Sequence, residues 1–136
     1  MTRQLGPLLL TVFVAVGACS FGSNPYLPPA NAAPLEVLTA YLEAYRGGQC
    51  GFARQLWIAA IRQVGDGDLC GDAHLTEYQI DPEPAAAAPD HAEFYTTLTT
   101  TGSNDGSVEP GETGWFFELG RQSDGTWRIM QGGSGP

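Results

Sequence analysis

Apolar residues recur at helical spacing in the first part of the foldable chain and at every second position in the rest. Leucines and tyrosines follow Pro34 at steps of three and four as far as Gly47 and Gly48, and residues 50–64 repeat the pattern. After residues 65–68 the apolar period becomes two, which is typical of half-buried strands. Helices followed by strands predict an α+β domain in which N-terminal helices pack on a curved antiparallel sheet.

The predicted strands lie at 75–80, 91–101, 114–120 and 126–131, and the last two form a predicted hairpin across residues 122–125. Residues 81–89 are a predicted loop, because prolines at that density cannot continue a strand ladder. Alternation along the hairpin places one set of side chains on its buried face. These are Trp115, Phe117, Leu119, Trp127 and Ile129.

The first nineteen residues have the pattern of an export signal. Arg3 precedes an uncharged apolar run over residues 5–16, which is shorter than the roughly 20 residues that a membrane span needs. Val16-Gly17-Ala18-Cys19 resembles the lipobox of bacterial lipoproteins. This resemblance implies that Cys19 is lipidated and becomes the mature N-terminus, so that the protein is extracytoplasmic and anchored to the cell membrane. The alternative is an ordinary secretory peptide that leaves Cys19 free.

A chain of 136 residues accommodates one hydrophobic core. We therefore expect a signal peptide over 1–18, a flexible tether over 19–33 that begins at the lipidated cysteine, and a single domain over 34–136. The tether is uncharged and rich in proline, glycine, serine, asparagine and alanine, a composition typical of linkers.

Once Cys19 is lipidated, two cysteines remain, Cys50 and Cys70, in a compartment where disulfides persist. We predict a disulfide between them; the alternative is two buried thiols. A straight helix over 50–64 would be about 21 Å long, whereas bridged Cα atoms lie within about 4.4–6.8 Å of each other. Either the helical segment splits near residues 57–59, or the chain returns tightly along the helix. We expect the split.

The two ends of the predicted domain are similar to a known superfamily. Leu35-Glu-Val-Leu-Thr-Ala-Tyr-Leu-Glu-Ala-Tyr45 resembles the first helix of nuclear-transport-factor-2-like (cystatin-like) domains. The segments Gly114-Trp-Phe-Phe-Glu-Leu119 and Gly125-Thr-Trp-Arg-Ile129 resemble their last strand pair, in particular that of small secreted lipoproteins from high-GC bacteria. The resemblance implies a cone around a cavity. In the superfamily's isomerases, dehydratases and cyclases that cavity holds an Asp or His as general base.

Carboxylates, histidines and tyrosines on or beside the predicted strands are the candidates for such chemistry. The possible bases are His74, His91, Glu77, Glu93 and Glu118, and the possible donors are Tyr41, Tyr78 and Tyr95. No motif joins a nucleophile, a base and an orienting group, so we assign no catalytic residue and favour a non-catalytic domain. The alternative is an isomerase-like or cyclase-like enzyme that uses a cavity carboxylate or histidine.

Residues 66–77 have the spacing of a calcium loop. Asp66, Asp68, Cys70, Asp72, His74 and Glu77 occupy positions 1, 3, 5, 7, 9 and 12 of an EF-hand pattern. A disulfide-bonded Cys70 cannot ligate calcium, and Glu77 belongs to a strand pattern. We interpret the segment as a polar turn and expect no metal and no other cofactor.

Aromatic residues at core spacing form a candidate pocket between helix and sheet. They are Tyr41, Tyr45, Trp57, Phe94, Phe116 and Trp127. We expect the partner to be a small apolar ligand or another envelope protein, in addition to the membrane that the lipid contacts. The basic residues are six scattered arginines and the net charge is −9, which excludes nucleic acid as a partner.

Overall fold

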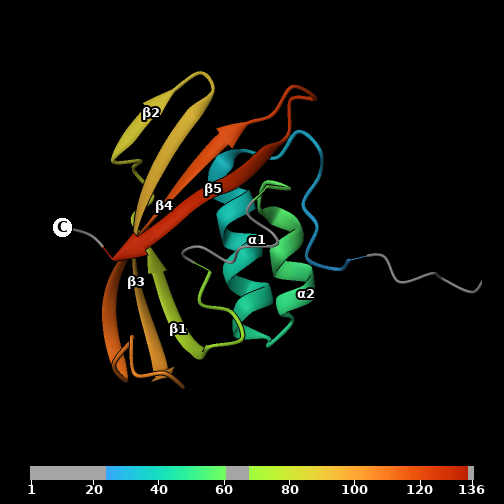
Figure 1. The fold of residues 1–136 in the computed structure, drawn as a ribbon. Helices are drawn as coiled ribbons and strands as arrows, with labels where there is room; N and C mark the ends of the chain where they lie inside the picture. Colours follow the sequence, from blue (N-terminus) through green and yellow to red (C-terminus); the bar gives the residue numbers. More distant parts are fainter. Residues whose placement is uncertain (1–23, 61–67, 135–136) are drawn as a thin grey trace, which may run out of the picture.

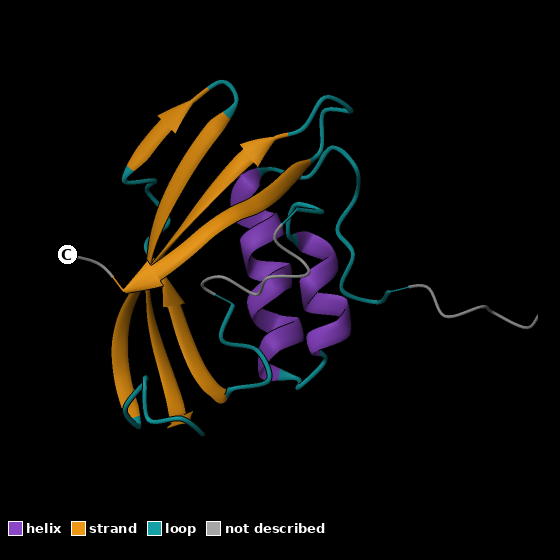
Figure 2. Cartoon of the chain, viewed as in Figure 1, coloured by secondary structure: helices purple, strands orange, loops and turns teal. Residues whose placement is uncertain are grey.

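The computed structural model describes residues 24–60 and 68–134, and most of this chain is antiparallel sheet (Figures 1 and 2). Helix α1 (Pro34–Arg46) is followed by a short helix α2 (Cys50–Ala53) and a 3₁₀ turn η1 (Arg54–Leu56). The strands are β1 (Ala73–Ile80), β2 (Ala86–Ala88), β3 (His91–Ser103), β4 (Gly111–Arg121) and β5 (Trp127–Ser134). None of the described helices is long and apolar enough to cross a membrane.

Helix α1 has the limits that its sequence predicts. Pro34 is the first helical residue, where no N–H is required, and the Ala33 N–H donates to the Glu36 carboxylate at 2.7 Å. After Arg46, Gly48 adopts a positive φ of 69°, which favours glycine and ends the helix. The buried side chains of α1 are Val37, Leu38, Tyr41, Leu42, Ala44 and Tyr45. They face the sheet, where α1 packs on β1 and β5.

Strand β3 is the centre of the sheet, whose order is β1-β3-β4-β5, with β2 paired to the start of β3. The pairing of Phe94 with Phe117 fixes the register of β3 and β4 on the inner face, which the helices cover. The predicted hairpin of β4 and β5 is confirmed. Of its predicted inner side chains, Trp127 is partly buried and packs on the core, and the others are buried: Trp115, Phe117, Leu119 and Ile129.

The predicted fold class, with N-terminal helices on a curved sheet in a nuclear-transport-factor-2-like cone, is wrong. The helical segment expected over 50–64 continues only to Leu56. Trp57 is extended, with φ −88° and ψ 156°, and forms a parallel bridge with Ile129. Because the chain joins β5 here, Leu56 and Trp57 become buried without further helical turns. The fold is a mainly antiparallel sheet with two short helices on one face.

Residues 24–33, which the sequence predicts to belong to the tether, pack on the domain instead. The Asn24 side-chain amide donates to the Phe52 carbonyl at 3.3 Å and to the Gln55 amide oxygen at 3.2 Å. The Tyr26 ring lies 6.3 Å from the Phe52 ring, and Ala32 is buried. The folded part therefore includes residues 24–33 and does not begin at residue 34. The predicted signal peptide and Cys19 lie outside the described residues.

A disulfide joins Cys50 to Cys70, with sulfur atoms 2.02 Å apart and Cα atoms 5.4 Å apart. It connects the first residue of α2 to the segment that leads into β1. The helical conformation ends at Trp57, which lies in the interval 57–59 where we expect the helical segment to split. Residues 61–64 of that segment lie outside the described residues. The disulfide thus closes a loop that contains all of α2 and η1.

Reduction of this disulfide should loosen the helical side of the domain first. Its sequence separation of 20 residues corresponds to about 3 kcal/mol of stabilisation in the chain-entropy model. Hydrogen exchange with reductant should show lost protection in α2 and around Cys70 before the β4–β5 hairpin. A Cys50→Ser/Cys70→Ser variant should show that pattern without reductant and not respond to it. Simultaneous loss of protection across the sheet would contradict the prediction.

Candidate functional site

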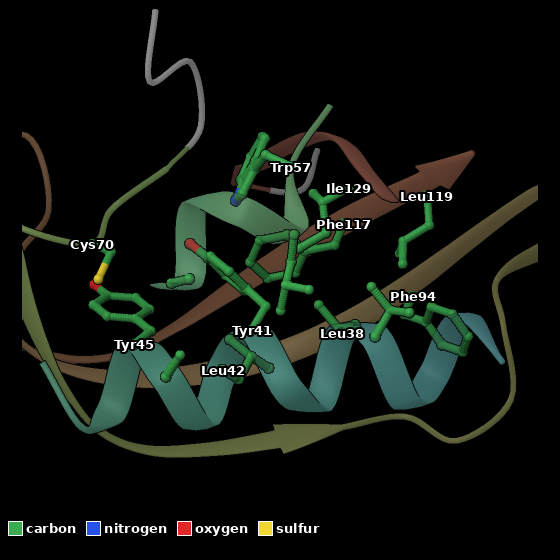
Figure 3. Packing of buried hydrophobic residues seen from close by; sticks show 14 of the residues in the cluster. Leu38, Tyr41, Leu42, Tyr45, Trp57, Cys70, Phe94, Phe117, Leu119 and Ile129 are labelled. Carbon is green, nitrogen blue, oxygen red and sulfur yellow. The ribbon is translucent and has the colours of Figure 1, made fainter. Parts of the chain in front are cut away.

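Four of the six predicted pocket residues form the core instead of lining a common pocket between helix and sheet. Tyr41, Tyr45, Trp57 and Phe94 are each at most 3% exposed. The Tyr41 ring lies 5.9 Å from that of Trp57 and 5.5 Å from that of Phe117, in both cases edge to face. Figure 3 shows these side chains directed toward one another between α1 and the sheet. The rings therefore fill the space that the predicted pocket would have occupied.

The other two predicted pocket residues are elsewhere. Phe116 alternates with the buried Trp115 and Phe117, so it lies on the outer face of the sheet, where it is half-buried. Trp127 begins β5 and packs at the edge of the core. The structure does not bring the six residues together.

A buried carboxylate, that of Asp68, connects the helices to the segment before β1. The Tyr41 hydroxyl donates to Oδ1 of Asp68 at 2.6 Å, and the Cys70 N–H donates to the same oxygen at 3.1 Å. The Arg54 Nε lies 2.9 Å from Oδ2, and Arg54 also donates through Nη2 to the Cys70 carbonyl at 2.7 Å. The Asp68 side chain is only 2% exposed. These contacts satisfy a charge that would otherwise be costly to bury.

The buried tyrosines around this cluster retain their protons to high pH. Burial, and then the charge of Asp68, raises the pKa of Tyr41 well above its ordinary value. Burial and the charges of Asp68 and Asp72 also raise the pKa of Tyr45, whose hydroxyl donates to the Leu69 carbonyl at 3.2 Å. Both phenols act as hydrogen-bond donors that hold the segment of residues 68–70 against α1.

The catalytic candidates are not gathered in one place. His91 lies 3.3 Å from Glu118 on the outer face, and Glu93 is paired with Glu118 across the strands. The Tyr78 hydroxyl donates to Glu43 of α1, and Tyr95 is 47% exposed. His74 and Glu77 are exposed on β1. Glu77 and Tyr78 line one open concavity of about 280 Å³. As sequence neighbours on a strand they point to opposite faces, and the Tyr78 hydroxyl already donates to Glu43, so this pair does not form the base and donor that the enzyme alternative needs.

The calcium-loop pattern is also dispersed. Asp68 binds Arg54 and Tyr41, Cys70 is in the disulfide, and Glu77 belongs to β1. Asp66 lies outside the described residues. No group of three or more acidic, histidine or cysteine side chains in the described chain is arranged to hold a metal ion.

An open polar cleft of about 550 Å³ lies between the segment of residues 68–72 and the start of β4. Its lining includes the carboxylates of Asp68, Asp72, Glu109 and Glu112. Carboxylates disfavour an apolar ligand, because such a ligand would remove them from water without a hydrogen bond. The cleft therefore does not replace the predicted apolar pocket.

The outer face of the sheet carries apolar side chains, among them Phe116 from the predicted pocket and Tyr95 from the candidate donors. Tyr95 and Phe116 are directly paired across β3 and β4, and Met130 of β5 is 37% exposed. Each side chain lies over a glycine of the neighbouring strand: Gly114, Gly133 and Gly120 respectively. The signal that could have identified this face is glycine at outward-facing positions of strands whose neighbours present large side chains.

Comparisons with known proteins support the fold only. No protein-family model and no curated protein matches the sequence. Among solved structures, the chain is similar to the solution structure of a SEC-C motif containing protein from Rhodopseudomonas palustris. The identity is 11% and the TM-score 0.58, over 79% of this chain and 82% of that one. This likeness does not indicate the predicted cone, and it brings no activity to this chain.

Replacing Tyr41 with phenylalanine should destabilise the domain by about 2 kcal/mol, because it removes a hydrogen bond to a buried charge. Urea unfolding of the Tyr41→Phe variant at neutral pH measures the effect. Tyr95→Phe is the matched control and should shift the free energy of unfolding by less than about 0.5 kcal/mol, since its ring is exposed. Equal losses in the two variants would show that the Tyr41–Asp68 bond contributes nothing specific.

Stability should fall in alkali as Tyr78 loses its proton. Burial, and then the hydrogen bond to Glu43, raises the pKa of Tyr78 to about 12 from about 10. Because the folded pKa is the higher one, this contribution to stability is complete below about pH 10 and is lost as the pH rises toward 12. Urea unfolding across this range should show the decline, and Tyr78→Phe should reduce its slope. An unchanged slope would contradict the assignment.

Proposed function

We propose that this protein is an extracytoplasmic lipoprotein, anchored to the cell membrane through Cys19, whose domain is a non-catalytic module that binds another envelope protein. The observation that carries the binding role is the filled interior. Aromatic side chains occupy the space between α1 and the sheet, and the Tyr41 hydroxyl is hydrogen-bonded to Asp68. A domain without an apolar cavity among its described residues interacts through its surface.

Two observations support the location. The sequence Val16-Gly17-Ala18-Cys19 follows a short apolar run, and the Cys50–Cys70 disulfide suits an oxidising compartment. Asn24 is already held on the domain, so the chain from Cys19 to Asn24 can span at most about 18 Å. A lipid on Cys19 would therefore keep the domain close to the membrane surface.

Mass spectrometry of the protein extracted from membranes in mild detergent tests both parts of the proposal. The intact chain should begin at a lipid-modified Cys19, and under native conditions it should carry a second protein. Cys19→Ala should abolish the modification and release the chain from the membrane fraction, whereas the neighbouring change Ser20→Ala should preserve both.

Two results would contradict the proposal. An unmodified N-terminus other than Cys19 would disprove the anchor. A lipidated monomer that carries a small apolar molecule and no protein would favour the ligand-binding alternative instead.

A further inference from the structure

The outer face of the sheet presents an apolar row, a row of carboxylates, and a third row in which the apolar Met130 lies over Gly120 between His91 and Arg128. We call these residues the outer-face patch: Tyr95 and Phe116 in one row, Glu93 and Glu118 in the next, and Met130 beside Gly120 in the third. Successive rows are two residues apart along β3 and β4, which separates them by about 7 Å. An occupant must therefore present an apolar side chain, a charged side chain and a second apolar side chain at intervals of about 7 Å.

Glycines on the neighbouring strands leave the space in which the apolar side chains of the patch lie flat against the sheet. A Cβ at Gly114 would collide with the Tyr95 hydroxyl, and one at Gly120 would collide with the Met130 sulfur. The Phe116 ring lies 3.2 Å from the Cβ position at Gly133. These side chains already lie against the neighbouring strand. They therefore lose little conformational freedom when a partner covers them, which lowers the entropic cost of binding.

The carboxylates of the patch determine which charge the occupant carries. Glu93 and Glu118 are directly opposite across β3 and β4, an arrangement in which like charges repel. His91 approaches Glu118 at 3.3 Å, and Arg128 in the neighbouring row donates instead to the Trp127 carbonyl. A cation placed between the two carboxylates would relieve the repulsion, so the patch is complementary to arginine or lysine.

Charge also excludes two other occupants. A second copy carries the same net charge of −9, so two copies repel each other. An anionic lipid surface is repelled in the same way. The described chain starts beside α2, on the side of the sheet that carries the helices (Figure 1). The outer face therefore lies on the side opposite the start of the described chain.

We propose that the outer-face patch docks a basic envelope protein whose contact surface places an arginine or lysine between two apolar side chains. This inference rests on the proposed function and adds the surface and the chemistry of the partner. The cation would bind between Glu93 and Glu118, and the apolar side chains would pack on the Tyr95–Phe116 pair and on Met130.

Site-specific photocrosslinking in the cells that make the protein tests the proposal. The full chain is produced with p-benzoylphenylalanine in place of Tyr95, and in a second strain in place of Leu27, which is similarly exposed at 50%. The position-95 probe should give one protein adduct whose crosslinked peptide contains arginine or lysine. The position-27 probe should not give that adduct.

Charge-neutral variants test the role of the carboxylates. Glu93→Gln/Glu118→Gln in the position-95 strain should reduce the adduct about tenfold, the loss expected when a close charge pair is removed. Asp72→Asn/Glu109→Gln removes the same charge from residues that line the cleft and should leave the adduct unchanged. Circular dichroism of each purified variant verifies that it is folded.

The remaining outcomes are decisive. An adduct at position 27 but not 95 would leave the protein-binding function standing and overturn the patch. Protein adducts at neither position would count against the proposed function itself. An adduct at position 95 to a second copy, to lipid or to a polysaccharide, or one that is insensitive to the Glu93 and Glu118 changes, would overturn the proposed partner chemistry.

Discussion

The carboxylate of Asp68 joins parts of the chain that have no strand pairing with one another. Tyr41 reaches it from α1, Arg54 from η1, and the backbone of Cys70 from the segment before β1. The Asp68 carboxylate is 2% exposed and needs all of these partners. The loss of any one would leave a buried charge without the contact that compensates for its lost hydration. The helical side therefore cannot shift against the sheet without breaking several contacts at once. The nearby disulfide fixes the same junction covalently.

The sequence was most informative where local chemistry and burial agree. Pro34 and the glycines at 47 and 48 limit α1, and alternation along residues 114–131 places Trp115, Phe117 and Ile129 on the inner face. Of the helix predicted over 50–64, the described residues after Leu56 are not helical, because apolar spacing up to Trp57 states only that these side chains are buried. It does not state that a helix buries them. The bridge between Trp57 and Ile129 is a long-range pairing that no local pattern encodes.

The candidate site was predictable only in its parts. Aromatic residues were identified as a group, but periodicity does not distinguish a ring that lines a cavity from one that fills it, and Tyr41 and Trp57 do the latter. Phe116 was misplaced because a single residue of a strand changes face with its parity. Residues 24–33 were misread because their composition is that of a linker, whereas Asn24, Tyr26 and Ala32 have specific contacts on the domain.

The attachment of Asn24 beside α2 has a mechanical consequence. Tension applied through a membrane anchor would enter the fold at the bonds from Asn24 to Phe52 and Gln55. Phe52 and Gln55 lie inside the loop closed by the disulfide, so the pulled segment rests on covalently reinforced structure. The segment of residues 24–33 would detach first, before the tension reaches α1 and the sheet on which α1 packs. The domain can therefore be pulled at its surface without its β-strands being drawn apart.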